Sequence, residues 1–128
     1  MSYYLSTALD AGFDEAIVRV EEALKKAGFG ILTRIDVHET MKAKLGLDLA
    51  PYVILGACNP KLAYEALQLE NKVGTMLPCN VVVQQLSSGK VEVAAIDPVA
   101  SMQAIDNPRL KGAALAVREK LSRVIEKL

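Results

Sequence analysis

The most constraining feature of the sequence is an unbroken apolar run from Tyr52 to Cys58, followed directly by Asn59 and Pro60. Successive side chains of a strand point to opposite faces, so a run that is apolar at every position predicts a central strand covered on both sides. Asparagine is a favoured helix N-cap, and proline suits the first helical position. We therefore expect a central strand that leads straight into a helix.

The residues on either side of this run predict four more strands and three more helices. Apolar residues at helical spacing between Phe13 and Ala27 indicate a helix that ends at Gly28. Similar patterns indicate helices over 37–45, 60–70 and 108–128, and strand patterns cover 3–9, 29–35, 80–86 and 90–96. Ser87-Ser88-Gly89 is the expected hairpin tip between the last two strands. The order β-α-β-α-β-α-β-β-α predicts an α+β fold, a two-layer α/β sandwich with helices packed on a single mixed β-sheet.

Length and charge limit the classes of protein that the chain can belong to. No repeat or linker divides the 128 residues, so we expect a single domain over 1–128 that buries about two-thirds of its unfolded surface. Fifteen basic residues balance fifteen acidic ones, which argues against nucleic acid as a partner. The apolar stretches are too short to span a membrane, and the first residues do not resemble a signal peptide. Two cysteines do not form a secreted disulfide framework, so a cytoplasmic protein with reduced thiols is expected.

The doublets Cys58-Asn59 and Cys79-Asn80 are the most suggestive candidates for chemistry. A thiol that ends a strand just before a helix, as Cys58 does, can have its pKa lowered by the helix N-terminus. Buried free cysteines also act as small hydrophobic residues, and both of these adjoin apolar runs. In parallel strands the two thiols would lie at opposite ends of the sheet, whereas an antiparallel return through Asn71–Pro78 would bring them together. Both arrangements remain open at this point.

Other chemistries lack the residues that they need. Four zinc ligands at close spacing are absent, and His38 is expected to be a solvated residue at a helix start, so we predict no metal and no other cofactor. Asp36 is expected to cap the helix that follows it, in a capping-box pattern with Glu39, and Asp97 to begin an Asp-Pro turn. With no complete catalytic set, we assign no catalytic residue, and the balance of the sequence is against an enzyme.

Small ligands often bind beyond the carboxyl ends of strands, where helix N-termini offer free N–H groups. Such a position lies at the end of the apolar run, next to the second cysteine doublet. The candidate ligand-binding residues are therefore Gly56, Cys58, Asn59, Cys79 and Asn80.

Four segments together resemble a known family, domain of unknown function 302, which comprises small bacterial and archaeal proteins. The segments are 28–32 (GFGIL), 52–60 (YVILGACNP), 77–83 (LPCNVVV) and 91–98 (VEVAAIDP). The resemblance covers nearly the whole chain. It implies a compact α+β domain and a homodimer, and it implies no activity, cofactor or catalytic residue.

The sequence thus leads to two expectations about function. The first is a non-catalytic cytoplasmic homodimer that binds a small polar ligand or a protein partner near Gly56–Asn59. The second is a thiol-dependent role, redox or nucleophilic, centred on Cys58 with Cys79 as its partner. Zero net charge and an apolar stripe on the C-terminal helix also favour self-association.

Overall fold

A single five-stranded sheet in the order β1-β5-β4-β3-β2 forms the centre of the computed structural model, which describes residues 2–128. The strands are β1 (Tyr4–Leu9), β2 (Gly30–Asp36), β3 (Tyr52–Cys58), β4 (Cys79–Gln85) and β5 (Val91–Ile96). The helices are α1 (Phe13–Lys26), α2 (Val37–Leu45), α3 (Pro60–Leu69), α4 (Pro98–Ser101) and α5 (Pro108–Glu126), with a 3₁₀ turn, η1, over Val73–Met76. The predicted α+β class and the order of the main elements are confirmed.

One detail of the predicted sheet is wrong, because all four neighbouring strand pairs are antiparallel and the sheet is not mixed. The helices α2 and α3 each connect strands that are adjacent in the sheet, β2 to β3 and β3 to β4. They therefore lie at the ends of the sheet and reverse the chain direction, whereas the crossover of a parallel pair would lie over a face.

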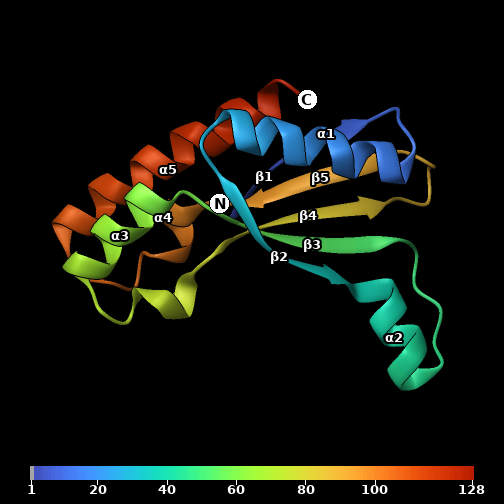
Figure 1. Cartoon of the computed structure of the whole chain (residues 1–128), viewed down its shortest axis with the longest axis horizontal. Coiled ribbons are helices and arrows are strands. Elements are labelled where there is room, and N and C mark those ends of the chain that lie inside the picture. The colour runs from blue at the N-terminus through green and yellow to red at the C-terminus, as the bar shows by residue number, and fades with distance from the viewer. Residues whose placement is uncertain (1) are drawn as a thin grey trace.

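The two faces of the sheet differ in how they are covered. Figure 1 shows α1 and α5 on one face and α2 on the opposite side, near the ends of β2 and β3. In β3, Val53, Leu55 and Ala57 are fully buried on the helix-covered face, whereas Tyr52 and Ile54 are only half-buried on the other. The expectation that β3 is covered on both sides is therefore wrong for its second face.

Most helices begin or end at the capping residues that the sequence predicted. Asn59 caps α3, since its side-chain oxygen accepts a hydrogen bond from Leu62 N at 3.2 Å. Gly28 follows α1 with a φ of 89°, in the left-handed region that favours glycine. The expected capping box at Asp36 is absent, because its carboxylate instead pairs with Arg34 at 3.1 Å.

Two clusters of buried side chains hold the fold together. The larger lies between the sheet and α1 and the second half of α5, where Leu121, Val124 and Ile125 are buried. The smaller joins α3, η1 and the residue after α4 to the first half of α5, through Ala66, Val73, Met102, Leu110 and Ala114. The stripe of α5 therefore covers the protein's own core. Among residues 2–128, no helix is both long and apolar enough to cross a membrane.

Candidate functional site

The antiparallel register of β3 and β4 brings the predicted site residues to one end of the sheet. Ala57 is paired with Cys79 and Gly56 with Asn80, so Cys58 and Asn59 lie at the same end as the start of β4. This settles the question that the sequence left open, because the two cysteines are neighbours. All five candidate residues lie within this corner of the fold.

The candidate residues do not share one face of the sheet. Alternation along β3 and β4 places Cys79 on the helix-covered face with Ala57, and Gly56, Cys58 and Asn80 on the opposite face. Cys79 is buried and Asn80 is exposed, while Cys58 is intermediate. Both thiols are free rather than joined in a disulfide.

The surroundings of both thiols favour their protonated forms. Burial raises the pKa of the Cys58 thiol above its ordinary value. Burial also raises the pKa of Cys79 to about 11, and the nearby Cys58 adds to this shift by charge repulsion. The helix N-terminus at Asn59 therefore does not produce a low-pKa thiol here, and both sulfurs are neutral at neutral pH.

A small cavity of about 30 Å³ lies at this corner, between the sheet and the helices α3 and α5. That volume is enough for one or two water-sized groups. Its wall includes Ala57, Cys58, Asn59 and Cys79 from the sheet end. The remaining walls are apolar throughout: Phe29, Leu62, Ala63, Ala66, Leu77, Pro78, Pro98, Met102, Leu110, Ala113, Ala114 and Val117. The chemistry of this lining favours an apolar group over an ion.

The helix N-terminus next to the cavity has few free donors left for an anion. Pro60 has no N–H, and the Asn59 side chain already accepts the hydrogen bond from Leu62 N. The main-chain oxygen of Asn59 accepts a hydrogen bond from Ala63 N at 2.9 Å. The cap that starts α3 therefore uses the same N–H groups that an anionic ligand would need.

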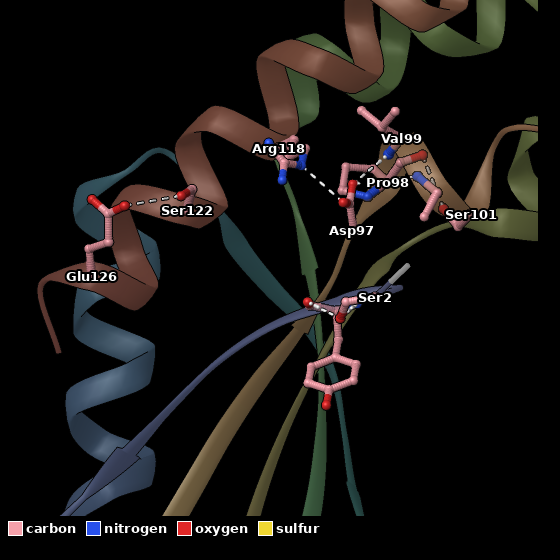
Figure 2. A network of polar contacts seen from close by, with 10 residues as sticks. Ser2, Asp97, Pro98, Val99, Ser101, Arg118, Ser122 and Glu126 are labelled. Atoms are coloured by element: carbon pink, nitrogen blue, oxygen red, sulfur yellow. Dashed lines mark hydrogen bonds and ion pairs between the residues drawn. The ribbon is translucent and has the colours of Figure 1, made fainter.

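An ion pair between buried Asp97 and half-exposed Arg118 lies beside the far wall of the cavity. Asp97 caps α4 by accepting a hydrogen bond from Val99 N at 3.0 Å, and its other carboxylate oxygen receives one from Arg118 Nε at 2.9 Å. Figure 2 shows Arg118 reaching from α5 to Asp97 at the start of α4. Pro98, the next residue, lines the cavity. The pair therefore positions α4 against α5.

The sequence predicted the position of Asp97 and did not indicate its partner, Arg118. It placed Asp97 at the start of an Asp-Pro turn, which is confirmed, since Asp97 is the N-cap of α4. Its partner Arg118 lies next to Val117 of the apolar stripe on α5. That position beside the buried stripe was the available signal that its side chain could reach inward.

His38 connects α2 to the sheet instead of facing solvent as predicted. Its Nδ1 lies 3.0 Å from Tyr52 N and 3.1 Å from Tyr52 O, so the ring contacts the β3 backbone in either tautomer. Its ring also packs edge-on against Phe13, with centroids 6.1 Å apart. Within residues 2–128, no three His, Cys, Asp or Glu side chains are placed to hold a metal ion together.

The fold and this corner define a class of protein: an α+β domain with one antiparallel sheet, helices over one face, and a small apolar cavity at the sheet end. Residues 5–128 match the family described as domain of unknown function DUF302, and the chain belongs to that family. It is similar to a solved structure described as the crystal structure of uncharacterized conserved protein DUF302 from Bacillus stearothermophilus. That chain is 33% identical, with a TM-score of 0.93, over 99% of this chain and 98% of the other. A comparison with curated proteins finds no match.

Proposed function

We propose that the chain is a non-catalytic, homodimeric cytoplasmic domain that binds a small molecule at the cavity beside Cys58, Asn59 and Cys79. The observation that carries this proposal is the apolar wall of that cavity at the end of β3 and the start of β4. The ligand inserts a small apolar group between α3 and α5, and its polar part lies beside Asn59. We expect a ligand with an apolar part and not a purely polar ligand, because N–H groups at the start of α3 already donate hydrogen bonds to Asn59.

Cys58 and Cys79 both belong to the wall of this cavity, and both thiols are neutral. A thiolate nucleophile would require a lowered pKa, whereas burial raises the pKa of both Cys58 and Cys79. A neutral thiol is small, polarisable and weakly polar, and it suits the wall of an apolar pocket. The thiol-dependent alternative therefore gains no support from the site.

The proposal is tested with xenon as an apolar probe and acetate as a polar one, by amide chemical shifts of the full chain. Xenon is expected to shift the amides of residues 57–59, 61–63, 77 and 79, and acetate to leave them unchanged. Ala63→Leu fills the cavity from α3 and should abolish the xenon response. The matched control is Ala104→Leu, at an exposed position outside the cavity, which should retain it. An unchanged spectrum under xenon, or a response that survives Ala63→Leu, would refute the proposed site.

A further inference from the structure

The face of the sheet opposite α1 and α5, the open sheet face, is more apolar than a solvated face should be. The register aligns Ser6, Ala94, Val82, Ile54 and Ile35 in one row across all five strands. Antiparallel sheets with one face in water normally alternate apolar-in with polar-out. On β3 and β4, the side chains of both sheet faces include large apolar residues, and Ile35 on β2 is 48% exposed.

Charge is nearly absent from the open sheet face. Two rows of this face are aligned across β1, β5, β4 and β3, and Glu92 is the one acidic or basic side chain in them. Its carboxylate accepts a hydrogen bond from Gln84 Nε2 at 3.0 Å. Tyr4 and Tyr52 lie at opposite margins, with a shallow hollow between them. Interfaces between proteins are depleted of charge at the centre and enriched in tyrosine. The chain as a whole is 23% charged, so this face is distinct.

The helix α2 and the segment after it add exposed apolar surface on the same side. Nothing in α2 is buried, and Leu45, Leu47 and Leu49 are 63%, 61% and 46% exposed. Figure 1 shows α2 standing beyond the ends of β2 and β3, away from α1 and α5. His38 fixes α2 to Tyr52 of β3. A helix that buries none of its own residues has an unpartnered face.

We propose that a second copy of this chain covers the open sheet face, with α2 and residues 45–49 of each copy packing beside the sheet of the other. The inference rests on the homodimer part of the proposed function and names its surface. It leaves the cavity near Cys79 accessible from the other side of the sheet.

The size of this surface matches what a stable pair needs. Five strands at about 4.8 Å spacing and about 20 Å in length present about 480 Å². A nine-residue helix adds about 140 Å², for a length of about 13.5 Å and a width of about 10 Å. Two such patches together exceed 1,200 Å², roughly the lower bound of a standard specific interface.

Symmetry and charge favour a second copy over other occupants. A two-fold axis brings the same patch against itself, and repulsion is small because the sheet rows carry one charge, Glu92, and the two acids of α2 and residues 45–49 are matched by two bases. An anionic membrane surface would be recognised by an excess of basic residues. The sheet rows have no basic residue, and the two lysines of α2 are balanced by Glu39 and Asp48. Two antiparallel sheets pack well face to face at about 10 Å separation.

The test is the mass of the full chain in solution by sedimentation across a range of concentrations. The wild type is expected to be a dimer. Val82→Lys places a cation at the centre of the face and is expected to weaken the dimer by about 100-fold or more, since both copies would bury it unpaired. Leu47→Lys lies at an exposed position outside the core, so it tests the same surface even if Val82→Lys fails to fold. Val18→Lys on α1, 52% exposed, is the matched control and should remain dimeric.

The outcomes separate this inference from the proposed function. A dimer that withstands both Val82→Lys and Leu47→Lys overturns the surface and leaves the homodimer standing. A monomeric wild type overturns both the surface and the homodimer, while ligand binding at the cavity is measured independently. A monomer that co-sediments with vesicles of anionic phospholipid would show that the face binds membranes, and it would overturn the inference.

Discussion

Gly56 lies where the chain has no room for a side chain, and replacing it with alanine tests the packing at the candidate site directly. A Cβ at this position would overlap the Thr33 hydroxyl and would lie 2.8 Å from Cγ of Pro78. The Thr33 side chain is exposed and free to rotate, but the proline ring is fixed to the backbone. The contact with Pro78 is therefore the one that resists the substitution.

The magnitude follows from two opposing effects. Replacing glycine by alanine restricts the unfolded chain and by itself stabilises by about 0.4–1 kcal/mol. Inserting a methyl group into a filled site costs about 1–3 kcal/mol, because neighbours must move. We expect Gly56→Ala to lower the free energy of unfolding by about 1–2 kcal/mol, a change of about 5- to 30-fold in the unfolding equilibrium constant.

Urea denaturation followed by circular dichroism measures this change. The matched control is Gly112→Ala in the interior of α5, where a Cβ meets nothing within 4 Å, and a gain of about 0.5–1 kcal/mol is expected. Thr33→Ala combined with Gly56→Ala should recover only part of the loss, because the contact with Pro78 remains. If Gly56→Ala is as stable as the wild type, Pro78 moves freely and the reasoning is wrong.

Four further predictions concern the two thiols, the ion pair between Asp97 and Arg118, and the contact of His38 with β3. The free energy of unfolding should fall between about pH 9 and pH 11, because folding raises the pKa of Cys79 from 9.0 to about 11 and the unfolded thiol ionises first. Thermal melts across this pH range measure the fall, and Cys79→Ala should remove it. Alkylation by iodoacetamide at neutral pH should modify Cys58 slowly and Cys79 not at all in the native state, as peptide mass spectrometry would show, and rapid labelling of Cys79 would contradict its burial. Asp97→Ala should cost about 2–3 kcal/mol in denaturant titration, since it removes a cap and unpairs Arg118, and Asp97→Asn should retain the cap and lose less. His38→Ala should cost about 1 kcal/mol and speed hydrogen exchange in α2; unchanged exchange would show that other contacts hold the helix.

The sequence was informative where the cause of a structure is local. The strand β3, the Asn59 cap and the glycine after α1 each depend on a few adjacent residues, and each formed at the predicted place. The coverage of β3 on both faces, which depends on distant elements, was predicted wrongly. The direction of β4 does not depend on adjacent residues, because the segment between α3 and β4 is long enough for a parallel or an antiparallel pairing with β3. The antiparallel pairing was therefore decided by packing and not by the turn.

The site itself was only partly accessible from the sequence. The residues Gly56, Cys58, Asn59, Cys79 and Asn80 were expected together and do lie at one corner. Their division between two faces follows from the register, which depends on the pairing partner. The apolar roof of the cavity comes from α5, about fifty residues away in the chain, so no local pattern could indicate that the pocket is apolar.

The separation of the core into two clusters has a consequence for how the molecule moves. The smaller cluster shares α5 with the larger one, yet its other members come from α3, η1 and the residue after α4, outside the sheet. Parts of a protein with their own small set of contacts open locally at lower free energy than the whole. This end of the molecule is therefore expected to open locally while the sheet stays folded. Such opening would widen the entrance to the cavity between α3 and α5.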